Sequence, residues 1–333
     1  MNKSVFKYLS GIIIPMIFAT SNTNAQQSGT GQMNSQNFPA AVSSSKNVIH
    51  LNMKDYITAE TPTSSEVEIM RNVVYVNRDG VELILHILYP KGAVSSLPCI
   101  VHVPGSAWME QNMTANIPNL TKVAARGYVV ASVQYRHSRI AVFPAQMQDA
   151  KTAIRFMRKN ATQYHVDTRN IFIWGDSSGG HTAMFAGFTQ ANQELDTDVY
   201  SEYSEKVNAV VNYYGPTELA KMSDYPSLMD HSLATSPEGL LIGGAIPDHP
   251  ERARKASPVY YVTSNVVPIF IAHGNRDTLV PLNQSDLLAE ALDKAGTYYE
   301  YYCLLDSGHG GPEFWTNEML DKVMNFIQKY TVK

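Results

Sequence analysis

Cysteine is scarce in this chain. Only two occur among its 333 residues, Cys99 and Cys303, and each lies within an apolar or aromatic run that is typical of a strand. This excludes a framework of several disulfides, and the sequence also lacks zinc-binding spacings such as CxxC or HExxH. Export would permit a disulfide, but isolated cysteines in core strands usually behave as small hydrophobes. We therefore expect two buried free thiols.

The chain also lacks an excess of charge of either sign. Charged residues make up 17% of it, the formal net charge is −4, and both signs are scattered. Because no basic stripe offers the phosphate contacts that nucleic-acid binding requires, we expect no nucleic-acid partner. Hydrophobic residues make up 44%, which is enough for a substantial core and predicts a globular chain.

The apolar run at the amino terminus is too short for a membrane span. It extends from Tyr8 to Ala19, follows two lysines and precedes small polar residues up to Ala25. A membrane helix must cross roughly 30 Å of hydrocarbon, whereas this order of segments is typical of a secretory signal peptide. We expect cleavage of residues 1–25 after Ala25, export to the periplasm or medium, and no stable membrane anchor. The alternative is an uncleaved signal anchor.

Two regions of different composition follow. Residues 26–62 are rich in Gln, Ser, Asn and Gly without a sustained period, which predicts a flexible linker. Over residues 63–333, eight strand-like runs alternate with helical ones, and the first two runs flank the hairpin signal Asp79-Gly80. This order predicts one α/β domain with a mostly parallel, twisted, eight-stranded sheet, an antiparallel leading strand and helices on both faces. The irregular stretch 216–265 is expected to form a small cap.

The stretch NIFIWGDSSGGHTAM, residues 170–184, passes from strand formers into two serines between glycines and then into helix formers. Within it, GDSSG fits the G-x-S-x-G pattern in the strand-turn-helix setting of a nucleophile elbow. In this register the hydroxyl of Ser177 is the expected nucleophile. Ser178 is expected to contribute only its backbone N–H, as a donor to the oxyanion.

A serine hydroxyl needs a neighbouring base and an acid that orients this base. Folds with a nucleophile elbow supply them in the chain order serine, acid, histidine. Asp277, in the loop after the run PIFIAHG, and His309, after the run YYCLL, stand at these positions. We therefore expect a triad of Ser177, Asp277 and His309. The alternative is that Asp277 caps a helix and His309 is an ordinary loop histidine.

The loop after VHVPG is expected to complete the oxyanion hole. The backbone N–H groups of Gly105 and Ser106 are the candidates beside that of Ser178, because Pro104 has no N–H. Trp108 is expected either to line the substrate pocket or to pack beneath the loop.

Four other polar residues are expected to have structural roles. His102 lies within a strand-like run and should be packed. His181 opens the helix after the elbow and should bond to nearby backbone. Arg136 and Asp149 should form an ion pair behind the elbow.

Seven motifs make the chain resemble a known family: GDSSGGH, YRHSRIAVFPAQMQDAKTAIRF, YYGPTELA, SPEGLLIGG, ASPVYYV, HGNRDTLVP and DSGHGG. They resemble α/β-hydrolase-fold esterases of the bacterial feruloyl-esterase-like and acetyl-esterase-like group, relatives of the hormone-sensitive lipase branch. The resemblance runs from about residue 70 to the carboxyl terminus and implies the same triad. Where that family usually has His-Gly-Gly-Gly-Trp, this chain has PGSAW over residues 104–108, which disfavours tertiary-alcohol and bulky acyl substrates.

These observations predict an exported serine carboxylesterase that acts through an acyl-enzyme and needs no metal or organic cofactor. The resemblance and the expected export indicate acetyl or feruloyl esters on plant polysaccharide such as xylan. The cap would select among them, with Tyr225 as a candidate substrate contact. The alternatives are a general short-chain esterase or lipase, a serine peptidase of the same fold, and a non-catalytic binding protein.

Overall fold

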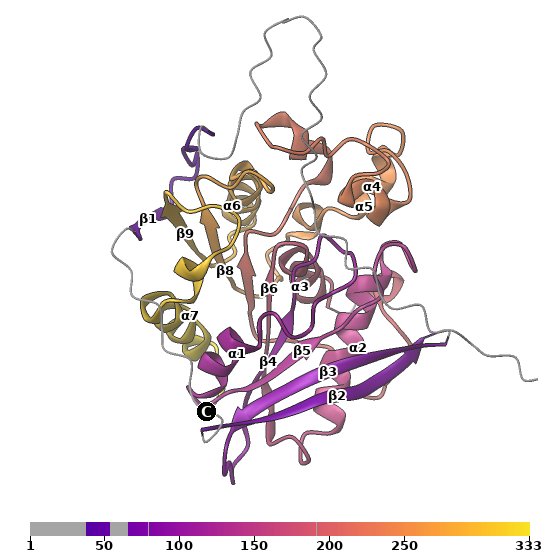
Figure 1. The fold of residues 1–333 in the computed structure, drawn as a ribbon, viewed down its shortest axis with the longest axis vertical. Helices are drawn as coiled ribbons and strands as arrows, with labels where there is room; N and C mark the ends of the chain where they lie inside the picture. Colours follow the sequence, from indigo (N-terminus) through magenta and orange to yellow (C-terminus); the bar gives the residue numbers. More distant parts are fainter. Residues whose placement is uncertain (1–37, 54–65, 79, 191) are drawn as a thin grey trace, which may run out of the picture.

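The computed structural model describes residues 38–53, 66–78, 80–190 and 192–333. The expected signal peptide and residues 26–37 and 54–62 of the expected linker lie outside the described residues. Within them the chain forms one nine-stranded sheet, in the order β1-β9-β8-β7-β6-β4-β5-β3-β2, with helices packed around it (Figure 1). None of the helices in these ranges has the length and apolar character that crossing a membrane requires.

The strands follow the runs that were read from the sequence, with one addition at the start. They are β1 (Val48–Asn52), β2 (Val67–Arg78), β3 (Val81–Pro90), β4 (Leu97–Val103), β5 (Val129–Val133), β6 (Val166–Asp176), β7 (Val210–Tyr213), β8 (Ile269–Gly274) and β9 (Tyr299–Leu305). The α-helices are α1 (Ile117–Ala124), α2 (Ala145–Lys159), α3 (Ser178–Phe188), α4 (Pro237–Ile242), α5 (Pro250–Lys255), α6 (Asn283–Ala295) and α7 (Asn317–Lys329).

The directions of the strands correct one detail of the expected sheet. β3 runs antiparallel to both β2 and β5, and the remaining pairs are parallel. The antiparallel strand is therefore the second of the hairpin and not the leading one. Arg78 pairs with Val81 and Gly80 has a φ of 86°, so the expected hairpin between β2 and β3 is confirmed. The turn's first residue lies outside the described residues.

The ninth strand, β1, lies within the stretch that was predicted to be a linker. It pairs in parallel with β9, from Val48 opposite Tyr301 to Asn52 opposite Leu305. Just before it, the N–H of Ala41 donates to the carbonyl of Asn275 at 2.7 Å. The linker prediction is therefore wrong for this stretch, and the expected count of eight strands is one too low.

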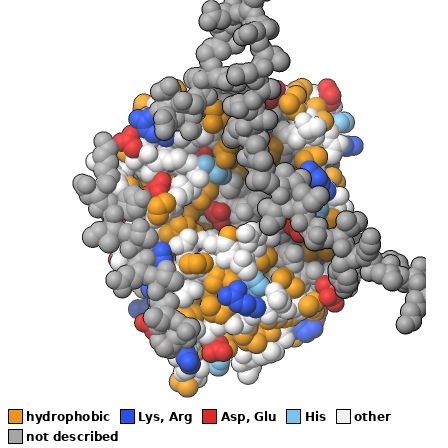
Figure 2. Space-filling model, viewed as in Figure 1, with side chains coloured by type: hydrophobic (Ala, Val, Ile, Leu, Met, Phe, Trp, Pro, Cys, Tyr) orange, Lys and Arg blue, Asp and Glu red, His pale blue; other side chains and the backbone are white. Residues whose placement is uncertain are grey.

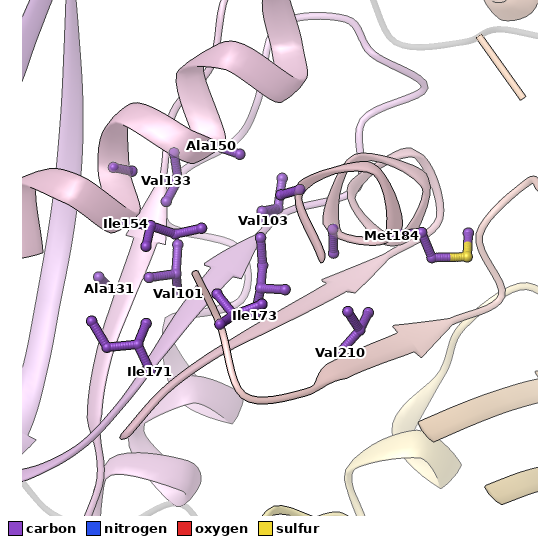
Figure 3. Close-up of a cluster of buried hydrophobic side chains, with 14 of the residues drawn as sticks. Val101, Val103, Ala131, Val133, Ala150, Ile154, Ile171, Ile173, Met184 and Val210 are labelled. Atoms are coloured by element: carbon purple, nitrogen blue, oxygen red, sulfur yellow. The ribbon is translucent and has the colours of Figure 1, made fainter. Parts of the chain in front are cut away.

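Helices cover both faces of the sheet. Apolar side chains of α2, α3 and α6 pack on one face, and those of α1 and α7 pack on the other. Figure 3 shows part of the first cluster, where Ala150 and Ile154 of α2 and Met184 of α3 meet side chains of the central strands. The interior strands β5, β7 and β8 are buried along their whole length, as parallel strands covered on both faces must be. This packing fixes the carboxyl ends of the strands, where the candidate residues lie.

The stretch 216–265 forms the expected separate layer at one end of the sheet. It contains η3 (Leu219–Asp224), α4, α5 and η4 (Pro258–Tyr261), and α4 and α5 lie together at the upper right of Figure 1. Its own small core joins Leu219, Leu241, Ile242, Ile246, Ala253 and Ala256 to Trp108. On the face drawn in Figure 2, acidic and basic side chains are interspersed without a large patch of one sign.

Candidate active site

A sharp turn presents Ser177 at the end of β6. The strand ends at Asp176, α3 begins at Ser178, and Ser177 between them has φ 53° and ψ −126°. Residues other than glycine rarely adopt such a positive φ. The N–H of Ser177 donates to the carbonyl of Tyr213 at 2.9 Å and helps to hold this conformation. The turn thus has the strained geometry of a nucleophile elbow.

The glycines of the motif are required by close approach of the backbone. A Cβ on Gly179 would lie 1.9 Å from the carbonyl oxygen of Val103, and one on Gly175 would lie 2.1 Å from that of Gly179. No side chain fits at these distances, so α3 can pack directly against β4 and β6 only with glycine at both positions.

The three residues of the expected triad lie within hydrogen-bond distance of one another. The Nε2 of His309 is 2.9 Å from the Oγ of Ser177, and its Nδ1 is 2.7 Å from the Oδ2 of Asp277. Asp277 follows β8 and His309 follows β9, so two adjacent parallel strands deliver them to the same edge as Ser177. The ring of Tyr214 packs edge-on against the imidazole of His309, with centroids 4.8 Å apart.

Asp277 is held as a charged acceptor. Its Oδ1 accepts the N–H groups of Leu279 at 2.9 Å and Val280 at 2.8 Å, while its Oδ2 faces the imidazoles of His309 and His273. Burial by itself would raise the pKa of Asp277, but the facing His309 and the hydrogen bonds from both imidazoles lower the pKa well below its usual range. The carboxyl group therefore stays ionised and can hold the Nδ1–H of His309.

His273 is a contact of this acid that the sequence did not reveal. Its Nε2 lies 2.9 Å from the carbonyl of Val280 and 3.2 Å from the Oδ2 of Asp277, and its Nδ1 lies 2.8 Å from the Oγ of Ser285. Because a carbonyl can only accept, Nε2 carries the proton and the Ser285 hydroxyl donates to Nδ1. The available signal in the sequence was the position of His273 near the end of β8, four residues before Asp277. A histidine that only packs in the core would occupy the same kind of position.

The expected set of oxyanion donors needs one correction. The N–H of Ser106 already donates to the Oγ of Ser178 at 2.9 Å, so it is not free to hold an oxyanion. In the part of the chain that the structure describes, the N–H groups of Gly105, Ala107 and Ser178 make no hydrogen bond. Ala107 has a φ of 54° and lines the cavity in front of Ser177. The loop's positive φ angles, which the sequence did not indicate, determine which N–H groups are free.

The Ser178 side chain has a partner as well, although only its backbone was expected to matter. The Tyr135 hydroxyl lies 3.4 Å from the Oγ of Ser178, 2.9 Å from the Oγ of Ser106 and 3.1 Å from the carbonyl of Pro104. Burial raises the pKa of Tyr135 to about 12, so its phenol keeps its proton and remains a donor. These bonds tie the loop after β4 to the elbow.

Trp108 lines the cavity, as one of the two alternatives for it expected, and its indole packs with the small core of the cap. Its side chain is buried, and its Nε1–H donates to the Nδ1 of His181 at 3.2 Å. The Nε2 of His181 lies 2.8 Å from the carbonyl of Ala256. The expected backbone partner of His181 therefore comes from the cap and not from nearby residues of its own helix.

We expect His181 to make the protein less stable in acid. Burial lowers the pKa of His181 from 6.5 to about 4, so between these values the unfolded chain takes up a proton that the folded chain refuses. This contribution to stability is complete above pH 6.5 and is lost as the pH falls to 4, by about 3 kcal/mol. Urea unfolding at pH 7, 5.5 and 4.5 should give a flatter dependence for His181→Gln than for the unaltered chain. If the free energy of unfolding fell with pH equally in both proteins, His181 would be excluded as the cause of the acid sensitivity.

A cavity of about 340 Å³ opens in front of Ser177 and His309. Its walls come from the loop after β4, the elbow and the cap, and they include Trp108 and Met229. Tyr225 is not among them. Its side chain is 52% exposed and lines a different cavity of about 220 Å³, next to residues 38–44. The structure therefore does not bring Tyr225 into the cavity in front of Ser177, and its contact with substrate stays a prediction.

The structural roles expected for other polar residues are confirmed. The side chain of His102 is fully buried, and its Nε2 lies 3.3 Å from the Oδ1 of Asp176. The guanidinium of Arg136 forms a bidentate ion pair with Asp149, with Nη2 2.9 Å from Oδ1 and Nε 2.9 Å from Oδ2.

Both cysteines are free and buried, as expected. Burial raises the pKa of the Cys99 and Cys303 thiols to about 12. They therefore remain protonated at physiological pH and are poor nucleophiles.

Comparison with known proteins agrees with this geometry. The chain is 30% identical to the esterase LipC of Mycobacterium tuberculosis over 217 residues, which make up 64% of this chain and 53% of that protein. It thus spans about half the length of the curated relatives it matches.

Two solved structures are also similar. A truncated carbohydrate esterase from gut microbiota has a TM-score of 0.73 and 30% identity, covering 82% of this chain and 100% of that one. A bifunctional GH43-CE protein of Bacteroides eggerthii has a TM-score of 0.71 and 32% identity, covering 82% and 39%. The BD-FAE family model matches residues 85–292. The chain has the α/β-hydrolase fold and belongs to the BD-FAE family.

Proposed function

We propose that the protein is a serine carboxylic-ester hydrolase that acts, after export, on acetyl or feruloyl esters of plant polysaccharide. The observation that carries this proposal is the continuous chain of contacts from Ser177 through His309 to Asp277, in which Ser177 and His309 line an open cavity. The similarity to an esterase and to a carbohydrate esterase supports both the reaction and the class of substrate.

The geometry fits an acyl-enzyme mechanism. The Oγ of Ser177 attacks the ester carbonyl while the Nε2 of His309 takes its proton, and Asp277 stabilises the resulting imidazolium. The oxyanion is held by the N–H of Ser178 together with those of Ala107 and Gly105. The proton then passes from His309 to the departing alcohol. Water next attacks the acyl-serine with His309 again as base, which releases the acid and restores Ser177.

A labelling experiment and a substrate panel test the proposal. An activated serine should react with a fluorophosphonate probe, and the labelled protein should lose activity on acetylated or feruloylated xylan. Absence of labelling in folded protein would instead indicate a binding protein. Turnover confined to emulsified long-chain triglyceride, or to peptides, would reassign the substrate to lipid or peptide.

A further inference from the structure

Glu238 of the cap lines the cavity in front of Ser177. It is the second residue of α4, directly after Pro237, and its side chain is only 3% exposed. It lies within the motif SPEGLLIGG, but the sequence assigned it no role, because an acid in the first turn of a helix is common on any surface.

The carboxyl group of Glu238 lies next to one imidazole and is not saturated with hydrogen bonds. Its Oε2 lies 3.1 Å from the Nδ1 of His231, whose side chain is also 3% exposed. Among the described residues, neither of these two atoms makes a well-aligned hydrogen bond. The Nε2 of His231 is fixed at 2.9 Å from the Oγ of Ser227. A carboxyl group offers about four acceptor positions, so Glu238 keeps accepting capacity that this neighbour does not use.

An acid at this place is costly unless a donor meets it. Burial of a carboxyl group without hydrogen bonds costs several kcal/mol. The cavity walls include apolar side chains such as Pro216, Met229 and Leu279, which cannot donate a hydrogen bond. A hydrocarbon chain in the cavity would leave the acid unsatisfied, whereas a substrate hydroxyl would satisfy it.

The position of Glu238 differs from that of the other carboxylic acid in the cavity walls, Asp176. Asp176 directly precedes Ser177 in the chain, and its Oδ1 lies 3.3 Å from the Nε2 of His102. Glu238 instead belongs to the cap and reaches the cavity from a different element. It can therefore contact a part of the substrate that the elbow does not hold.

We infer that Glu238 accepts a hydrogen bond from a sugar hydroxyl of the ester substrate and thereby selects carbohydrate esters over esters of simple alcohols. The inference rests on the proposed function and adds the residue that recognises the alcohol part of the ester substrate. Of the donors a polysaccharide presents near its ester groups, hydroxyls are the most abundant, and carboxyl oxygens bind them strongly.

The test compares Glu238→Met with Glu238→Gln on two acetyl esters. One is an acetylated methyl xyloside, which carries sugar hydroxyls, and the other is 4-nitrophenyl acetate, which carries none. The ratio of kcat/KM values for the two should fall about tenfold or more in Glu238→Met, the size expected for one hydrogen bond to a charged group. It should fall less in Glu238→Gln, whose amide oxygen still accepts. The matched control is Glu251→Gln, an exposed acid in the first turn of α5, which should leave the ratio unchanged.

Four outcomes would overturn the inference. If Glu238→Met loses activity equally on both esters, Glu238 has a structural role. If the selective loss appears with methyl ferulate and not with the acetylated xyloside, the hydroxyl belongs to the acyl part. An unaltered enzyme that cleaves the xyloside, with an unchanged ratio in Glu238→Met, overturns this inference alone. An unaltered enzyme that cleaves only nitrophenyl acetate overturns the proposed substrate class as well.

Discussion

Replacing Ser177 with alanine should lower kcat/KM for 4-nitrophenyl acetate by about 10⁴-fold or more in a protein that remains folded. The Oγ of Ser177 is the atom 2.9 Å from the Nε2 of His309, and no other hydroxyl is recorded at that nitrogen within the described residues. Alanine fits the backbone of the turn no worse than serine does, so the loss should be confined to the chemistry. Initial rates give the effect, and circular dichroism with the melting temperature verifies the fold.

The neighbouring Ser178 provides the control. Ser178→Ala removes the acceptor of the Ser106 N–H, a hydrogen bond of 2.9 Å, but leaves the backbone N–H of residue 178 in place. A neutral hydrogen bond contributes about 1 kcal/mol, so a loss of less than about tenfold is expected. If both alanine variants lost activity to the same extent, the assignment of Ser177 as nucleophile would fail.

Replacing Asp277 with asparagine should lower kcat/KM by about 10⁴-fold, although the volume of the side chain is conserved. The asparagine oxygen will stay with the N–H groups of Leu279 and Val280, which need an acceptor. Its NH₂ group then faces the Nδ1 of His309 and the Nε2 of His273. In the unaltered chain both nitrogens carry a proton and donate to the carboxylate, so an NH₂ group cannot replace it as acceptor. His309 is driven to the tautomer with its proton on Nε2, and that nitrogen can no longer take a proton from Ser177.

The same measurement on Asp230→Asn supplies a reference for the loss of one acidic charge. Asp230 is exposed, and its Oδ1 accepts hydrogen bonds from the backbone N–H and the hydroxyl of Ser232, two residues further on. Its replacement should leave kcat/KM within about twofold, as is usual for surface changes. A comparable loss in Asp230→Asn would mean that net charge, and not the acceptor for His309, explains the effect in Asp277→Asn.

Local sequence was sufficient for the elbow and the triad. Glycines flank Ser177 because α3 packs on the backbone of β4, and this constraint is visible in the five adjacent residues of the motif GDSSG. Asp277 and His309 could be placed because each follows a recognisable strand of a parallel sheet, whose carboxyl ends share one edge. The ion pair of Arg136 with Asp149 was found for a similar reason, since the two residues are close in the sequence.

Features that depend on distant packing were missed. The free N–H groups near Ser106 depend on positive φ angles at Ala107 and Trp108, which neither residue type favours. Tyr225 lines a different cavity, which the sequence could not indicate because composition identifies the cap but not the direction in which its side chains point. Glu238 gains its importance only where the cap folds over the cavity, a contact without any local pattern.

The pairing of β1 with β9 sets the order in which the fold can be completed. The two strands lie about 250 residues apart, so nearly the whole polypeptide must be available before they meet. We expect this pairing to form late, because contacts between segments far apart in the sequence form more slowly than local ones, although the entropic cost of closing the loop rises only gradually with its length. Until then β9, with three tyrosines among its seven residues, is an unprotected edge open to other chains. The segment that looked like a tether thus covers β9 and leaves the five-residue β1 as the edge strand of the sheet, and a short edge strand is a poorer template for pairing with other chains.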